Sequence, residues 1–159
     1  MTLLRILIDA DACPVKDEVY RVAFRRGVYR VAFRRGVAVK VVSNDRIRIP
    51  DHPLVERVVV SDAFDAADDW IAETATPADV VITADILLAD RCLKAGATVI
   101  AGNGKPFTSA SIGSAIATRA IMADLRAGGE QLGGPAAFTK ADRSRFLQAL
   151  DEALVRLAR

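Results

Sequence analysis

The stretch "LLRILIDADACP", residues 3–14, decides the fold of this chain. Its apolar run at 3–8 has the length of one buried strand and ends at two carboxylates, Asp9 and Asp11. Pro14 then stands where a helix would begin, and residues 15–26 carry apolar side chains at helical spacing. The stretch therefore predicts a strand, a turn with two acidic side chains, and a helix.

The rest of the 159 residues continues this alternation. Strands are expected at 37–43, 57–60, 79–84 and 97–101, helices at 62–75 and 86–96, a turn at 102–108, and two last helices at 109–127 and 139–159. Thr139 and Asp142 have the spacing of an N-terminal helix cap. Alternation of this kind is typical of an α/β fold. We expect one three-layer, Rossmann-like domain over 1–159 with a mainly parallel five-stranded sheet. A Gly-rich linker at 128–138 separates the last two helices, which would cover one face or edge of the sheet.

Residues 19–36 spell the nine residues VYRVAFRRG twice. Nine residues advance a helix by about 900°, so the two copies are half a turn out of phase. Because deleting either copy leaves an ordinary strand–helix–strand connection, we interpret the repeat as an insertion into a finished fold. One copy would occupy the core helix, closed by Gly27 or Gly36, and the other would extend it or loop out. Exposed Val and Phe side chains would then promote a homodimer or a strand-swapped oligomer.

The alternative interpretation of the repeat is a functional arginine arm, because it holds six of the 22 basic residues. The 22 basic and 20 acidic residues of the whole chain give a net charge of only +2. The overall charge therefore does not indicate a nucleic-acid-binding protein.

No segment suits a signal peptide or approaches the length of a membrane span, so we expect a cytoplasmic protein that makes no membrane contact. Cys13, Cys92 and the single histidine, His52, lack the spacing of zinc ligands. We expect both thiols to be reduced and at least half-buried.

Acidic residues follow two of the expected strands. In an open parallel sheet, ligands bind beyond the carboxyl ends of the strands, where the strand order reverses. In the common 3-2-1-4-5 order, Asp9 and Asp11 would lie near Asp85 after the fourth strand, with Asp90 five residues further on. Ionised carboxylates at such distances repel one another, and Mg²⁺ or Mn²⁺ would neutralise them. Such an ion can activate water for displacement at phosphorus. The alternative is that these residues only cap helices and solubilise strand ends.

Other polar residues near the same edge suit a phosphate ester. They are Lys16 in the first helical turn, Asn44 and Thr83 near strand ends, Arg91 after Asp90, and Asn103 and Lys105 in the turn after the fifth strand. Each could equally be a capped turn or a solvated surface residue. Asp65, Asp68 and Asp69 would come near if the third strand ends beside them, although an acidic first helical turn is the simpler explanation for these three.

Five segments resemble the YaiI/YqxD family of uncharacterised bacterial proteins. They are IDADACPVKDE (8–18), DAADDWI (65–71), VITADILLADRCLKAGATVI (81–100), NGKPFT (103–108) and GGPAAFTKADRSRFLQALDEAL (133–154). The chain departs from the family at Leu87, where proline is usual, and in the second copy of the repeat. The resemblance implies a PIN-like domain, related to metal-dependent ribonucleases, with carboxylate ligands at Asp9, Asp11, Asp85 and Asp90. The family has no established activity.

Three functions compete at this stage. The first is a Mg²⁺- or Mn²⁺-dependent nuclease acting on RNA: Asp9, Asp11 and Asp85 would hold the metal, Asp90 would position water, and Lys105 or Arg91 would contact phosphate. The second is a phosphatase of the haloacid dehalogenase type, with Asp9 as nucleophile and Asp11 as acid/base. Cys13 counts against it, because that superfamily usually has Thr or Val there. The third is a non-catalytic module that binds nucleic acid or protein.

Overall fold

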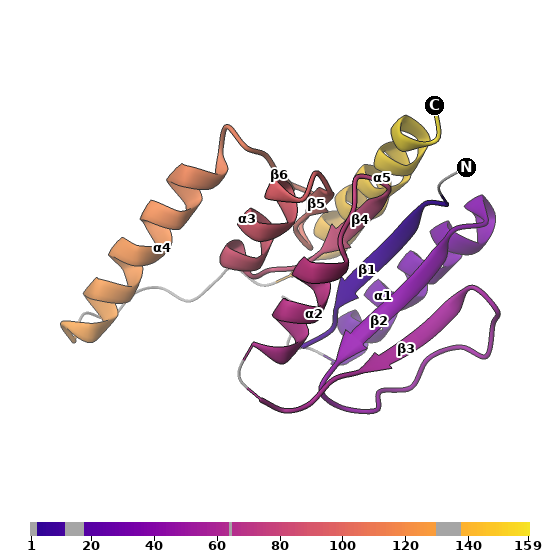
Figure 1. Ribbon diagram of the computed structural model, residues 1–159, viewed down its shortest axis with the longest axis horizontal. Coiled ribbons are helices and arrows are strands. Elements are labelled where there is room, and N and C mark those ends of the chain that lie inside the picture. The colour runs from indigo at the N-terminus through magenta and orange to yellow at the C-terminus, as the bar shows by residue number, and fades with distance from the viewer. Residues whose placement is uncertain (1–2, 12–17, 64, 130–137) are drawn as a thin grey trace.

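The computed structural model describes residues 3–11, 18–63, 65–129 and 138–159. A six-stranded sheet lies at its centre, in the spatial order β3-β2-β1-β4-β5-β6 (Figure 1). Its strands are β1 (Arg5–Asp9), β2 (Ala38–Ser43), β3 (Val55–Val59), β4 (Asp79–Ile82), β5 (Thr98–Ile100) and β6 (Pro106–Phe107). Strands β1 to β5 pair in parallel, which confirms the expected α/β class and the 3-2-1-4-5 order.

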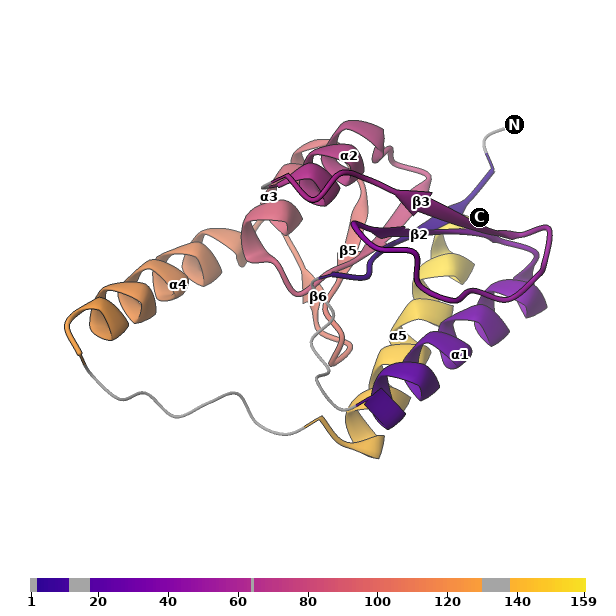
Figure 2. The same cartoon turned by 90° about the horizontal axis from the view of Figure 1, so that it is seen from below.

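The described residues contain five helices. They are α1 (Glu18–Arg35), α2 (Ala66–Thr74), α3 (Ile86–Lys94), α4 (Ile112–Ala127) and α5 (Lys140–Leu157). Figure 2 shows α1 and α5 on one face of the sheet and α2 and α3 on the other. None of the described helices combines the length and the apolar character that a bilayer crossing needs. The three-layer arrangement leaves the carboxyl ends of the strands open at one edge.

The side chains of β1 alternate between two hydrophobic cores, one on each face of the sheet. Ile6 and Ile8 belong to the core shared with α1 and α5, whereas Leu7 belongs to the core shared with α2 and α3. All three are at most 3% exposed. Because side chains alternate along a strand and both faces carry helices, the three residues between Arg5 and Asp9 are all apolar.

Both copies of the repeat lie within one helix, α1, so the second copy extends the helix rather than looping out. The half-turn offset separates equivalent residues: Phe24 is 1% exposed against Phe146 of α5, while Phe33 is only partly buried and stacks on His52. Gly36, at a φ of 66°, ends the helix, and Val37 N–H reaches the Ala32 carbonyl.

Gly27, the equivalent glycine of the first copy, lies inside the helix instead. A Cβ there would come within 2.8 Å of Leu147, so this glycine permits close packing of α1 on α5. The large apolar side chains that are exposed in the described part of the chain lie outside α1, at Leu3, Val59, Leu87 and Ile121. The expected exposure of Val and Phe is therefore wrong for the described part of α1, whereas oligomerisation itself stays a prediction.

The end of the sheet and α4 differ from the sequence-based expectation. The segment expected to be only a turn contains β6, which pairs antiparallel with β5 at the edge of the sheet. Pro106 is compatible with this position because an edge strand needs fewer N–H donors. Helix α4 contacts α3 through Ile112 and Ile116 but then projects away from the body (Figure 1), so it does not cover the sheet. Most of the linker at 128–138 lies outside the described residues.

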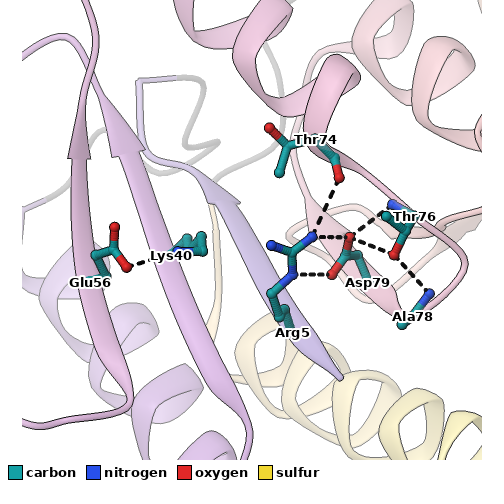
Figure 3. Close-up of polar contacts among 7 residues, drawn as sticks. All are labelled: Arg5, Lys40, Glu56, Thr74, Thr76, Ala78 and Asp79. Atoms are coloured by element: carbon teal, nitrogen blue, oxygen red, sulfur yellow. Dashed lines mark hydrogen bonds and ion pairs between the residues drawn. The ribbon is translucent and has the colours of Figure 1, made fainter. Parts of the chain in front are cut away.

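A buried ion pair joins the amino ends of β1 and β4, at the edge opposite the acidic turn (Figure 3). Arg5 Nε and Nη2 each lie 2.8 Å from an oxygen of Asp79, whose side chain is fully buried. The same carboxylate accepts hydrogen bonds from the backbone N–H and the hydroxyl of Thr76. Asp79 therefore fixes the β4 start and the preceding turn, which is a structural role.

Candidate functional site

Asp9 ends β1 at the point where the strand order reverses. It is only 2% exposed, and the Thr83 hydroxyl donates a 2.8 Å hydrogen bond to its Oδ2. Thr83, 1% exposed after β4, also accepts a hydrogen bond from the Asp85 backbone N–H. A carboxylate this deeply buried requires polar partners, and Thr83 supplies one of them from the neighbouring strand.

Asp11 is held by the end of β2. The buried hydroxyl of Ser43 donates to its Oδ1 at 2.8 Å, and the backbone N–H of Asn44 donates to its Oδ2 at 2.8 Å. The Ser43 hydroxyl in turn accepts a hydrogen bond from the N–H of Asp45. Both oxygens of Asp11 thus accept hydrogen bonds, which fix the orientation of its side chain.

Asp85 and Asp68 bring acidic groups to the same place from two helices. Asp85 is the N-cap of α3, and its Oδ1 accepts hydrogen bonds from the N–H groups of Leu87 and Leu88. The pKa of Asp68, in the first turn of α2, is raised to about 7. Burial is the main cause, followed by the charges of Asp85 and Asp9 and a hydrogen bond with Asp85. Asp9, Asp68 and Asp85 therefore form one interacting acidic group.

An open cleft of about 310 Å³ lies against Asp9 and Asp68, whereas Asp85 is not part of its lining. Its lining comes from the ends of β1 and β2, the loop after β3 and the start of α2, and includes Asp9, Asp11, Asn44, Asp62, Asp65 and Asp68. The described lining contains five aspartates and no basic side chain. Asp65 adopts a φ of 63°, the one described non-glycine residue with a positive φ. Backbone strain of this kind persists where the surroundings impose it, and here it lies in the cleft wall.

The cleft contains oxygen ligands that suit a hard divalent cation, but the described ligands are not arranged around a common metal position. Its oxygens are carboxylates, the ligands that Mg²⁺ and Mn²⁺ prefer. The pKa of Asp68 is raised first by burial and then by the charges of Asp85 and Asp9, which a cation would neutralise. As the side chains lie, however, no three His, Cys, Asp or Glu groups within the described residues are arranged to hold a metal ion. A cation would therefore require side-chain rotation or ligands from water.

The structure places Asp90 and Arg91 in α3, and neither residue is part of the cleft lining. Asp90 lies five residues after Asp85, which rotates it by about 140° around the helix, and it pairs with Lys94 at 3.0 Å. Arg91 pairs with Asp69 of α2 at 2.8 Å. Arg91 thus joins α2 to α3 close to Asp68, while Asp90 forms an ion pair within its own helix.

Asn103 and Lys105 lie in the turn between β5 and β6, at the same edge of the sheet as the cleft. The Asn103 side chain accepts a hydrogen bond from the Lys105 N–H and so closes its own turn. Strand β5 is two positions from β1 in the sheet, roughly 10 Å away at the usual strand spacing. A Cβ added at Gly104 would come within 2.9 Å of the Arg145 backbone in α5, so glycine allows this turn to approach α5 closely. Lys16 and Cys13 lie outside the described residues.

Two further residues have the structural roles expected of them. Cys92 is fully buried in α3, and burial raises the pKa of its thiol to about 11, so it is unreactive at neutral pH. His52 stacks on Phe33 with ring centroids 3.9 Å apart, and its Nδ1 accepts a hydrogen bond from Leu54 N–H. Neither side chain belongs to the cleft lining.

Sequence reasoning gave too little weight to Asp68 and omitted Ser43. The sequence pattern alone favours an acidic first helical turn for Asp68. Its approach to Asp9 depends on the path of the loop after β3, which the pattern does not determine. The signal that could have found it is the run DAADD immediately after a third strand at the same edge. Ser43 is the last residue of β2. A polar side chain at the carboxyl end of a strand, like that of Asn44, is the signal that could have identified it.

Comparison with known proteins agrees with the resemblance of the motifs. The model of the family described as "Uncharacterized BCR, YaiI/YqxD family" matches residues 7–156. A UPF0178 protein of Sphingopyxis alaskensis is 72% identical over 155 residues, covering 97% of this chain and 95% of the relative. A UPF0178 protein of Nitrobacter winogradskyi is 58% identical over 159 residues, covering 100% and 96%. No solved structure matches. The chain belongs to the YaiI/YqxD family.

Proposed function

We propose that this member of the YaiI/YqxD family is a nuclease that depends on Mg²⁺ or Mn²⁺ and acts on RNA. The observation that carries the proposal is the coupling of Asp68 to Asp85 and Asp9 at the carboxyl edge of β1 and β4. A carboxyl group whose pKa is raised by burial and by two neighbouring carboxylates, at the switch point of a parallel sheet, is the feature of this chain with the clearest chemical consequence.

Each acidic residue has a distinct part in the proposed site. Asp9, Asp11 and Asp85 would hold the cation, and Asp68 would join them once it is ionised. A bound Mg²⁺ or Mn²⁺ would supply an activated water and charge neutralisation at the scissile phosphate. Thr83 and Ser43 keep Asp9 and Asp11 oriented through their 2.8 Å hydrogen bonds. Arg91 and Lys105 are the proposed phosphate contacts, and Asp90 the residue that assists from α3.

A phosphatase with Asp9 as nucleophile and Asp11 as general acid fits the hydrogen bonds less well. To reach a leaving group, Asp11 would have to give up the hydrogen bonds that Ser43 and the Asn44 N–H donate to its two oxygens. The third function, a non-catalytic binding module, is the outcome if no cation binds.

The test is calorimetric titration of Mn²⁺ and Mg²⁺ into the wild type and the double variant Asp9→Asn/Asp85→Asn. The matched control, Asp124→Asn/Glu152→Gln, removes the same charge from α4 and α5, outside the cleft lining. The proposal predicts saturable binding that the cleft variant loses and the control keeps, together with metal-dependent cleavage of a mixed-sequence RNA that follows the same pattern.

Two results would count against the proposal. If the wild type binds neither cation, the cleft is not a metal site and the acidic residues serve structure or docking. If a cation binds but RNA stays intact while a phosphomonoester is hydrolysed, the phosphatase takes precedence.

A further inference from the structure

The charge of this chain is distributed unevenly over its helices. Helix α1 contains six arginines and a single acidic residue, Glu18, while the chain as a whole has a net charge of only +2. The acidic excess lies elsewhere, notably in α2 and in the cleft beside it. Figure 2 shows α1 on the face of the sheet opposite α2. The molecule therefore has one basic helix and one acidic side.

The phase of the repeat determines which arginines reach the surface. Arg21 and Arg25 of the first copy are partly buried, whereas Arg30 and Arg34, their equivalents in the second copy, are exposed half a turn away. Arg26 is also exposed, one turn before Arg30. Arg26, Arg30 and Arg34, all exposed, follow one another at i, i+4 and i+8 in α1 and form a stripe about 12 Å long.

The stripe is poorly neutralised within the described residues. Like charges at i, i+4 repel one another on a helix. Arg34 shares Asp151 of α5 with Arg35, through contacts of 2.9 and 2.7 Å, and still has an exposed side chain. Neither Arg26 nor Arg30 has an ion-pair partner in the part of the chain that the structure describes. The stripe has the spacing and free donors to receive anions from outside.

We propose that the arginine stripe, Arg26, Arg30 and Arg34, binds the phosphodiester backbone of a nucleic acid without reading its sequence. A guanidinium group presents paired N–H donors that match phosphate oxygens, and a stripe on a straight helix suits a ligand whose charges recur along a line. The inference rests on the proposed function for its choice of polyanion, since the stripe would hold the RNA that the cleft cleaves. Binding itself requires neither metal nor cleavage.

A nucleic acid fits this surface better than an anionic membrane. Membrane-surface helices pair their basic side chains with large apolar ones that enter the lipid. In the described part of α1, by contrast, Phe24, Val28 and Val31 are at most 6% exposed, and none of the exposed large apolar side chains lies in this helix. The stripe therefore offers charge and hydrogen bonds but no apolar insertion.

The test is binding of a fluorescent 16-nucleotide single-stranded RNA in EDTA, by anisotropy, at several salt concentrations. The variant is Arg26→Gln/Arg30→Gln, which keeps good helix formers at exposed positions. The matched control, Arg119→Gln/Arg126→Gln, removes the same charge from exposed positions of α4, on the far side of the molecule (Figure 1). Thermal unfolding verifies that both variants fold.

The Arg26→Gln/Arg30→Gln variant loses two phosphate contacts. A plot of log K against log salt should therefore become less steep by about 1.4, and binding at 0.1 M salt should be about 25-fold weaker. The control should change the affinity less than threefold. Equal losses in both variants, or no binding by the wild type, would overturn the proposal. So would stripe-dependent binding to phosphatidylserine vesicles without binding to RNA. Because EDTA is present, an inactive or metal-free cleft would leave the predicted binding intact, so the two proposals fail separately.

Discussion

Replacing Asp68 with Asn should stabilise the protein at pH 8 and leave its stability unchanged near pH 4. In the folded protein the pKa of Asp68 is raised from 3.8 to about 7 by burial and by Asp85 and Asp9. The folded state therefore binds more protons than the unfolded state between these pH values, so this contribution is fully present below pH 3.8 and is lost as pH rises through about 7.

The size of the effect follows from the shift after a correction for solvent. A shift of about three units corresponds to roughly 4 kcal/mol at full burial. Because Asp68 is only partly buried, solvent screening reduces this, and we expect a gain of about 1–2 kcal/mol in the free energy of unfolding. Urea unfolding of both proteins from pH 4 to pH 9, with the midpoint and slope fitted at each pH, measures it.

The matched control is Asp69→Asn. Asp69 lies beside Asp68 in α2 but is exposed and paired with Arg91, so this variant should lose at most about 0.5 kcal/mol and show no comparable pH-dependent gain. Saturating Mg²⁺ should flatten the pH dependence of the wild type if a cation enters the cleft. If Asp68→Asn gains nothing at pH 8, or gains the same amount at every pH, the three carboxylates are not coupled as described.

Three further substitutions test other features of the fold. Asp65→Gly should stabilise by about 0.5 kcal/mol in urea unfolding, since glycine accepts the φ of 63°, whereas Asp62→Gly removes the same charge without that gain. Tyr29→Phe should raise stability by about 1 kcal/mol, because the buried Tyr29 hydroxyl has no hydrogen-bond partner among the described residues; a loss would reveal a partner. Asp79→Ala should cost about 3 kcal/mol by leaving Arg5 unpaired, and a cost below 1 kcal/mol would contradict its structural role.

Local pattern was sufficient to predict the sheet and part of the site. The apolar runs before Asp9 and Asp85 are strands because both faces of the sheet are covered, and the order of the parallel strands follows the common doubly wound arrangement. The cap at Thr139 and Asp142 was equally readable, since it depends on residues three apart. These features share a short range: each follows from periodicity or from a fixed spacing along the chain.

What escaped prediction depends on the path of loops and on long-range packing. Asp68 reaches Asp9 and Asp85 only because the loop after β3 places the start of α2 over the carboxyl edge. The direction in which α4 projects depends on how far its contacts with α3 extend. The apolar periodicity along α4 does not determine the extent of these contacts. Strand β6 has two residues, too few for any apolar alternation to be recognised.

The repeat shows how one sequence can have two structural roles within a single helix. Identical nonapeptides differ in burial because they follow one another half a turn out of phase, so Phe24 enters the core and Phe33 stacks at its margin. The glycines differ too, since Gly27 allows α1 to approach α5 and Gly36 ends the helix. The same offset exposes the second set of arginines. An insertion and an arginine surface are therefore compatible interpretations, because a duplication tolerated by the core would create the stripe as its geometric consequence. RNA affinity that Arg26→Gln/Arg30→Gln loses and the Arg119→Gln/Arg126→Gln control keeps would give that stripe a function.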